Sequence, residues 1–203
     1  MAADRTAILA WISAAAAEIV TDADDAADIA VRIDAADTLG VAAFAAETID
    51  LVRIIGESVR DGRGFAALAL PETAGETRDA LALLSAIGQA LAIGRVAWPS
   101  RPAARAARTR LGNAAELAYA IAARLDAGLY AWLRALMQVA IRLVSEIAAN
   151  STPMARVTTN TSLPSTALAY QLYGDATRAG QLIDTAGSAT PMLMPGSFDA
   201  LAG

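Results

Sequence analysis

The sequence contains no cysteine, no histidine and no lysine, so all sixteen of its positive charges are arginines. These absences exclude Ser-His and Cys-His nucleophile pairs, Schiff-base lysines, thiolate or imidazole zinc sites, and disulfide bonds within the chain. Carboxylates remain as acid and base groups, but none lies in a motif with a nucleophile or a phosphate-binding glycine loop. We therefore expect no enzyme activity, no cofactor and no metal site.

The chain also has no uncharged run long enough to cross a bilayer in its first half. Twelve uncharged residues separate Arg5 from Glu18, and fifteen separate Asp79 from Arg95, whereas a spanning helix needs about 20 mostly apolar residues. The start is a poor secretory leader, because Asp4 cancels the charge of Arg5. We expect no membrane partner.

Four aspartates, Asp22, Asp24, Asp25 and Asp28, are the one arrangement that invites a calcium site. An EF-hand loop that began at Asp22 would need an oxygen ligand at its fifth position and glycine at its sixth. Alanines, Ala26 and Ala27, stand there instead. Acidic residues at a helix start complement the helix dipole, which is the interpretation that we prefer.

Charge is distributed unevenly along the 203 residues. The net charge is −8 over residues 1–50, −1 over 51–94 and +4 over 95–203. The asymmetry fits either paired faces of neighbouring copies in an assembly or two solvated faces of one helical body.

Apolar residues recur at helical spacing over most of residues 1–150, which predicts a mainly α fold with a multi-helix body. The expected helices are 4–20, 21–37, 41–60, 76–98, 102–126 and 130–147, with a loop over 61–75 and a possible hinge over 61–76. A small α+β module is expected to follow over 151–203.

The last of these helices has the clearest pattern. Its apolar stripe has the spacing 3-4-3-4-3, and three further leucines widen it. The stripe residues are Tyr130, Leu133, Met137, Ala140, Val144 and Ile147, widened by Leu129, Leu136 and Leu143. A broad apolar side of this kind must be buried, against another helix of this chain or against another copy.

The final fifty residues predict a strand, two short helices and a second strand. The β-branched run 157–161 is expected to be a strand that ends before Pro164. Ser165 or Thr166 is expected to cap the helix that follows, and Gly174 is expected to end that helix. Asp175 is expected to cap the second helix, and a turn at Pro195-Gly196 leads to a strand over 198–201. This order is that of a LysM-like module.

The amino-acid sequence of this segment resembles that of a known family. The runs 169–178 (AYQLYGDATR) and 190–196 (TPMLMPG), followed by Leu201, are similar to the carboxyl end of the DNA circularisation proteins of Mu-type phages. The resemblance implies a structural component of a contractile phage tail or baseplate, or of a prophage-derived particle. It would lie in the virion, and in the host cytoplasm during assembly, as a homo-oligomer (hexamer or trimer) with tube and hub proteins as partners.

Two groups of residues are the candidates for contacts. The assembly and module-core residues are Tyr170, Leu172, Tyr173, Gly174, Pro191, Met194, Pro195 and Phe198. The basic cluster is Arg95, Arg101, Arg105, Arg108 and Arg110. The cluster fits a protein neighbour, a solvated face or a nucleic acid, although no aromatic side chain interleaves with it to stack bases. Two alternatives stay open beside the tail function: a DNA-binding protein that circularises or protects injected ends, and a peptidoglycan-binding module.

Overall fold

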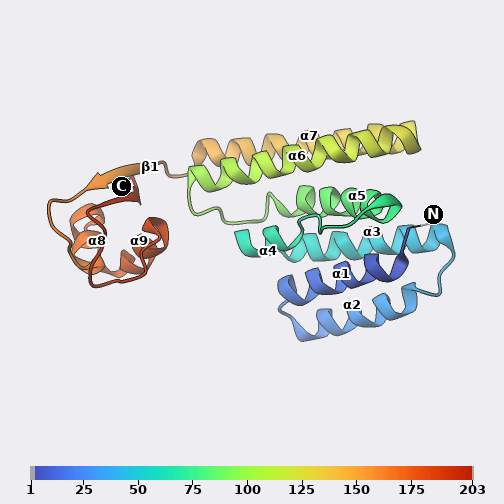
Figure 1. The fold of residues 1–203 in the computed structure, drawn as a ribbon, viewed down its shortest axis with the longest axis horizontal. Coiled ribbons are helices and arrows are strands. Elements are labelled where there is room, and N and C mark those ends of the chain that lie inside the picture. Colours follow the sequence, from blue (N-terminus) through green and yellow to red (C-terminus); the bar gives the residue numbers. More distant parts are fainter. Residues whose placement is uncertain (1–2, 203) are drawn as a thin grey trace. The chain divides into compact units, whose positions relative to one another are not determined.

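The computed structural model describes residues 3–202 and confirms the mainly helical prediction, with 70% helix and one small two-stranded antiparallel sheet (Figure 1). The chain divides into two compact units. Unit 1 comprises Met1–Trp98 and Arg105–Ile147, and unit 2 comprises Pro99–Ala104 and Ala148–Gly203.

Seven helices contribute to unit 1: α1 (Arg5–Ile19), α2 (Ala23–Ala36), α3 (Val41–Ser58), α4 (Gly62–Ala67), α5 (Gly75–Ala92), α6 (Arg101–Leu125) and α7 (Ala127–Asn150). Within this unit α1 and α2 lie on one side of the α3 and α5 pair, and α6 and α7 lie on the other (Figure 1). One continuous core runs through these layers.

Aspartates begin several of the helices. The carboxylates of Asp4, Asp22 and Asp61 each accept hydrogen bonds from two backbone N–H groups of the first turn, at 2.8 to 3.4 Å. Such bonds satisfy donors that have no partner inside the helix. The acidic stretch after Thr21 is therefore a helix start, as expected.

The cap at Asp61 corrects the loop expected over 61–75. Gly62–Ala67 is helix α4, whose Phe65 is buried, and Leu68 behind it is fully buried. Sequence periodicity missed α4 because it has only six residues and two of them are glycines, which disfavour helix. The hinge over 61–76 stays a prediction.

Three further details differ from the expected helices. Helix α5 ends at Ala92, because the chain then turns so that Trp98 packs edge-on against Phe65, with centroids 5.4 Å apart. Helix α6 begins at Arg101, one residue before its expected start. Helix α7 begins at Ala127, three residues before its expected start.

Unit 2 contains β1 (Met154–Thr158), α8 (Ser165–Tyr173), the short 3-10 helix η1 (Ala176–Arg178), α9 (Ala179–Ala186) and β2 (Ser197–Leu201). The strands pair antiparallel, with Met154 opposite Leu201 and Thr158 opposite Ser197. The first strand begins three residues earlier than the expected 157–161. Helix α8 has Pro164 at its cap position rather than Ser165 or Thr166, because Ser165 is buried and its N–H donates to the Pro191 carbonyl at 2.7 Å.

One helix of the described residues, α7, is long and apolar enough to cross a membrane by length and composition. The same test is passed by core helices of soluble proteins. In unit 1 one side of α7 is a core side, because Leu133, Met137, Ala140 and Val144 are buried there.

Candidate assembly surfaces and basic cluster

Two of the predicted module residues form the centre of unit 2. Met194 and Phe198 are 1% and 2% exposed, and they pack with Leu168 and Leu182 from the two helices. Leu172 is partly buried against the same cluster. Burial of side chains this large is the main favourable contribution to folding of a small unit.

Tyr173 joins three elements of unit 2. Its hydroxyl oxygen accepts a hydrogen bond from the Leu201 N–H at 3.2 Å, which connects α8 with β2. The guanidinium carbon of Arg178 lies 3.9 Å from the centre of the Tyr173 ring, a cation-π contact with η1. Tyr173 is therefore a packing residue of the unit.

Gly174, Pro191 and Pro195 act through the backbone. Gly174 has φ +70° at the end of α8, a conformation that glycine adopts without strain. The carbonyl of Pro191 receives the first N–H of α8, and Pro195 lies in the turn before β2. The predicted turns therefore fix where α8 begins and ends.

Tyr170 is a correction. Its side chain is 66% exposed, so it is not part of the module core; its role as an assembly contact stays a prediction. Position 170 lies on the outer side of α8, because Leu168 and Ala169 take the inner side. The run 192–194 splits in the same way: Met192 and Leu193 are 70% and 66% exposed, and Met194 alone is buried.

Two of the five arginines of the basic cluster, Arg95 and Arg101, make contacts with other residues of the chain. Arg95 follows α5 and pairs with Glu57 of α3 at 3.9 Å. Arg101 donates from Nε to the Ser151 carbonyl at 3.3 Å and from Nη2 to the Ala149 carbonyl at 3.1 Å. A cation at the C-terminal end of α7 is favourable for the helix dipole. These two arginines are accordingly occupied by intramolecular contacts.

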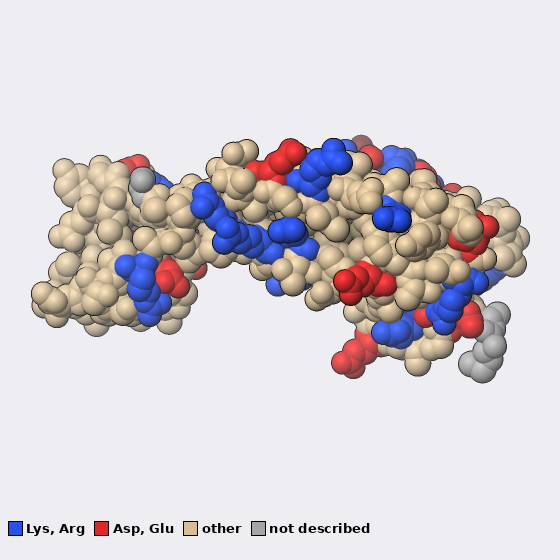
Figure 2. Space-filling view, turned by 90° about the horizontal axis from the view of Figure 1, so that it is seen from above, with Lys and Arg blue, Asp and Glu red and all other residues tan. Residues whose placement is uncertain are grey.

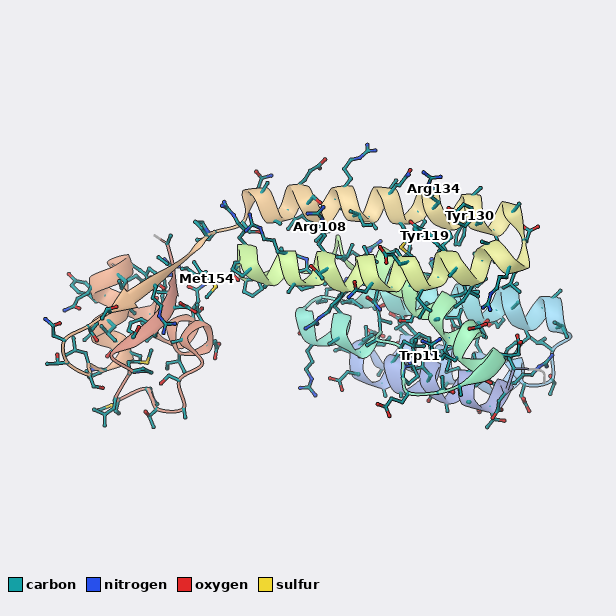
Figure 3. All side chains as sticks on the ribbon, turned by 45° about the horizontal axis from the view of Figure 1, so that its top comes forward. Trp11, Arg108, Tyr119, Tyr130, Arg134 and Met154 are labelled. Atoms are coloured by element: carbon teal, nitrogen blue, oxygen red, sulfur yellow. The ribbon has the colours of Figure 1, made fainter. Side chains whose placement is uncertain are left out.

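Arg105, Arg108 and Arg110 are exposed on α6 within unit 1 and make no ion pair among residues 3–202. Figure 2 looks onto the α6 and α7 side of the unit and shows arginine side chains along it. Arg108 on α6 and Arg134 on α7, both labelled in Figure 3, are exposed. Positive charge on this side is therefore available to an external anion or acidic surface.

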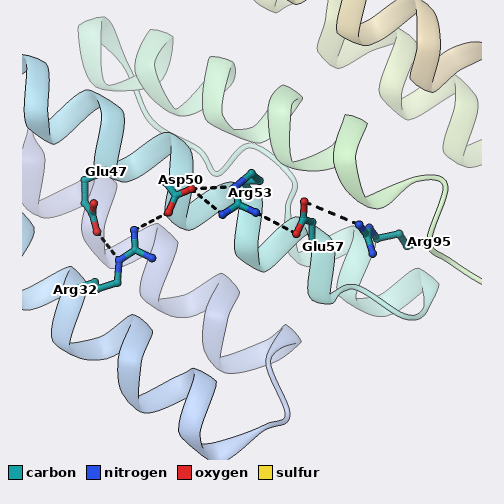
Figure 4. Close-up of polar contacts among 6 residues, drawn as sticks. All are labelled: Arg32, Glu47, Asp50, Arg53, Glu57 and Arg95. Carbon is teal, nitrogen blue, oxygen red and sulfur yellow. Dashed lines mark hydrogen bonds and ion pairs between the residues drawn. The ribbon is translucent and has the colours of Figure 1, made fainter.

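A chain of ion pairs connects α2 to α3 (Figure 4). Arg32 of α2 donates to Glu47 at 2.7 Å and to Asp50 at 2.8 Å, and Arg53 links Asp50 at 2.9 Å with Glu57 at 3.2 Å. Arg53 and Glu57 have the i,i+4 spacing of neighbours on one helix face. Arg32 lies fifteen positions or more from its partners, so no helical spacing connects them.

These contacts change the proton affinities of the groups involved. Hydrogen bonds from Arg32, and then from Arg53, lower the pKa of the Asp50 carboxyl. Hydrogen bonds to Glu47 and Asp50 raise the pKa of Arg32. In unit 2 the side chain and backbone of Thr177 lower the pKa of Asp175, the cap of η1. All of these shifts stabilise the charged forms, which is what structural ion pairs and caps do.

Two cavities of unit 1 are lined mainly by apolar side chains. One of about 510 Å³ is lined mostly by alanine, leucine and Phe65, with Ser85 and Gln89 as buried polar groups. The Ser85 hydroxyl donates to the Leu68 carbonyl at 2.6 Å and accepts from Gln89 at 3.0 Å, so it is engaged in packing. A second cavity, about 300 Å³, is almost wholly apolar.

No group of three or more acidic side chains that would hold a metal ion occurs in the described part of the chain. Burial raises the pKa of the Tyr119 hydroxyl, and the ring of Tyr119 meets that of Tyr130 edge-on, with centroids 5.8 Å apart, between α6 and α7 (Figure 3). Packing explains this shift without a catalytic role.

No protein-family model matches the chain, and no curated protein sequence matches it significantly.

Proposed function

We propose that the protein is a non-catalytic structural component of a contractile phage or prophage-derived tail or baseplate, acting as an assembly joint near the tail tube and hub. The observation that carries the proposal is the carboxyl segment, where the runs 169–178 and 190–196 resemble the end of the Mu-type circularisation proteins. The protein would be present in several copies, as a hexamer or trimer, in the virion.

Unit 2 supports the proposal through its architecture. The residues that carry the resemblance connect the elements of the unit. Tyr173 contacts β2 and η1, and Gly174 ends α8. The carbonyl of Pro191 accepts a hydrogen bond from the first N–H of α8, and the Met194 N–H donates to the Leu163 carbonyl just before that helix. We interpret the unit as a degenerate LysM-like module, since its strand, helix, helix, strand order and antiparallel pairing are those of that outline. A module of this kind would serve as a joint without any sugar ligand.

The side chains available agree with a structural role. Cysteine, histidine and lysine are missing from the whole sequence. Acids with lowered pKa values, Asp50 and Asp175, are engaged in ion pairs and caps that favour the ionised form. A general acid or base near neutral pH needs the opposite shift, toward the working pH.

The test is incorporation into particles. We expect mass spectrometry of purified tails to detect the chain in a ratio of three or six copies per particle. Tyr170→Ala, which removes an exposed ring, should lower incorporation without lowering the free energy of unfolding, whereas Gln171→Ala on the same exposed side of α8 should leave it unchanged. Absence of the chain from purified particles would overturn the proposal.

A second candidate, a DNA-binding protein for injected ends, is favoured by the unpaired arginines on α6. Phosphate neutralisation predicts binding that weakens steeply with salt. Arg105→Gln with Arg108→Gln should reduce the slope of log K against log salt by about 2, one unit for each lost phosphate contact. Arg134→Gln with Arg142→Gln removes the same charge from α7 and is the control. An unchanged slope in the α6 variant, or an equal reduction in both, would reject α6 as the DNA surface.

A third candidate, a peptidoglycan binder, rests on the exposed Met192 and Leu193 in the loop before β2. A pull-down with purified peptidoglycan decides it. Retention that is lost in Met192→Ser with Leu193→Ser would favour sugar recognition over the joint.

A further inference from the structure

The larger cavity of unit 1, about 510 Å³, lies where three segments meet: α4 with the turn that follows it, α5 and α6. On α5 and on α6 the lining residues are spaced by three and then four positions, so each set occupies one face of its helix. The two sets are Ala82, Ser85 and Gln89 of α5, and Arg110, Asn113 and Leu117 of α6.

Small side chains make room between the three segments. Ala66 and Ala69, Ala82 of α5 and Ala114 of α6 all line the cavity. A methyl group fills far less space than the leucine or phenylalanine of a closely packed core. The volume falls within the roughly 300 to 1,000 Å³ that is usual for small-molecule sites.

Polar groups lie at the buried and at the exposed parts of this lining. Ser85 and Gln89 are 1% and 6% exposed, whereas Arg110 and Asn113 are exposed on α6. The ring of Phe65 and the side chain of Leu117 provide apolar wall. A cavity of this kind, apolar with a few polar groups at defined places, is typical of a ligand site.

Gln89 presents a buried acceptor that the protein leaves without a donor. Its Nε2 donates to the Ser85 hydroxyl at 3.0 Å and to the Leu68 carbonyl at 3.4 Å. The Ser85 hydroxyl donates to the same carbonyl at 2.6 Å, so the amide must turn its N–H groups, and not its oxygen, toward Leu68. No hydrogen bond reaches Gln89 Oε1 from residues 3–202. A buried acceptor favours a ligand that brings a donor.

Arg110 supplies a cation on the open side of the cavity. It makes no ion pair within the described part of the chain, and no aspartate or glutamate lines the cavity beside it. Asn113 lies one helical turn further along α6 and adds an amide donor. A guanidinium matches the planar, two-oxygen geometry of a carboxylate.

We infer that this cavity binds a small apolar carboxylic acid that carries a hydroxyl group, with a phenolic acid as its simplest rigid form. The carboxylate pairs with Arg110, the apolar body lies against Phe65 and Leu117, and the hydroxyl donates to Gln89 Oε1. A plain hydrocarbon acid is a poorer ligand, because it would bury that oxygen without a donor. Ligand binding here goes beyond the proposed assembly role and does not depend on it.

Calorimetric titration of the purified full chain with three related compounds tests the chemistry. We expect para-hydroxyphenylpropionate to bind at one site with a Kd below about 1 mM, as its small size allows. Phenylpropionate lacks the hydroxyl, and para-hydroxyphenylpropionamide lacks the charge. Each should bind about tenfold more weakly, since each loses one of the two polar contacts. Failure of para-hydroxyphenylpropionate to bind, or equal affinity for all three compounds, would overturn the inference.

Two substitutions locate the site. Arg110→Gln should weaken binding of para-hydroxyphenylpropionate about tenfold and leave its amide unaffected, because only the acid pairs with the guanidinium. Arg108→Gln removes the same charge from an exposed position of α6 that does not line the cavity, and should bind as the parent does. Both positions are exposed, so neither change should shift the thermal midpoint. An equal loss of affinity in the two variants would show general charge attraction instead of a site.

Gln89→Met tests the buried end of the cavity. The measured quantity is the ratio of the affinities for para-hydroxyphenylpropionate and phenylpropionate within this one variant, so looser packing that weakens both ligands leaves it unchanged. We expect the preference of about tenfold in the parent to fall to about one, because the acceptor is gone. An unchanged preference would exclude Gln89 as the partner of the hydroxyl and reject the inference. Incorporation into tail particles is a separate measurement, so either result can fail without the other.

Discussion

Gly56 of α3 lies directly against Gly88 of α5. A Cβ atom on residue 56 would come 3.0 Å from the Gly88 carbonyl oxygen, and one on residue 88 would come 3.0 Å from a methyl carbon of Val52. The two helices cross here at the centre of unit 1, and Gly56 and Gly88 are both buried. Because neither glycine has a side chain, α3 and α5 can approach closely at this point.

We expect Gly56→Ala to lower the free energy of unfolding by up to about 2 kcal/mol. Alanine favours helix by about 1 kcal/mol over glycine, but the new methyl group meets backbone, which cannot move aside as a side chain does, and overpacking of this kind costs about 1 to 3 kcal/mol. Gly112→Ala in α6 is the matched control, since no atom lies within 4 Å of its new Cβ. Chemical denaturation should show that variant to be more stable than the parent.

Arg32→Gln should release α2 from α3. The change removes two charge-assisted contacts from a half-buried site and leaves Glu47 without its cation. We expect a loss of about 1 to 2 kcal/mol, within the range for hydrogen bonds to charged groups. Arg78→Gln, at a side chain with no ion pair among the described residues, should change stability by less than about 0.5 kcal/mol. Hydrogen exchange would localise the effect, with faster exchange confined to α2.

Acid should weaken the same contact. The folded-state pKa of Asp50 lies below its ordinary value of 3.8, so its stabilising contribution is complete above pH 3.8 and is lost as the pH falls through the lower, folded-state value. Unfolding measured from pH 7 down to pH 2.5 should show the parent and Asp50→Asn differing at neutral pH and converging in acid. A constant difference over the whole range would contradict this linkage.

In unit 2, Phe198→Ala should cost about 3 to 5 kcal/mol, since the ring is 2% exposed and its removal leaves a cavity. A unit of this size is expected to unfold as a result. Tyr170→Ala should be nearly neutral, because that ring is largely in solvent. Proteolysis of residues 148–203 would separate the outcomes: rapid for Phe198→Ala, and at the parental rate for Tyr170→Ala.

Gly174→Ala isolates the contribution of one turn. Alanine at φ +70° is strained, so we expect a loss of about 1 kcal/mol. Gly180→Ala in α9 has free space for its Cβ and ordinary helical geometry, and should stabilise the unit. Equal effects of the two substitutions on the thermal midpoint would argue against strain at residue 174.

Much of the architecture follows from local chemistry. Asp4 and Asp22 begin helices because a short carboxylate satisfies free N–H groups, and Gly174 ends α8 because it alone takes a positive φ there without strain. Periodicity likewise identified Leu133, Met137 and Val144 as core residues of α7. These features involve groups a few positions apart, so their spacing in the sequence carries the information.

Tertiary packing decided the rest. Whether Trp132 or Leu133 of α7 enters the core depends on how that helix is rotated against α5 and α6. Arg32 meets Glu47 and Asp50, and Gly56 meets Gly88, only because separate helices cross at those points. The residues of the sequence determined which segments become helices and where they end. Only the fold determined which apolar and charged faces are buried inside the molecule and which remain exposed. Burial depends on contacts between segments that are distant in the sequence.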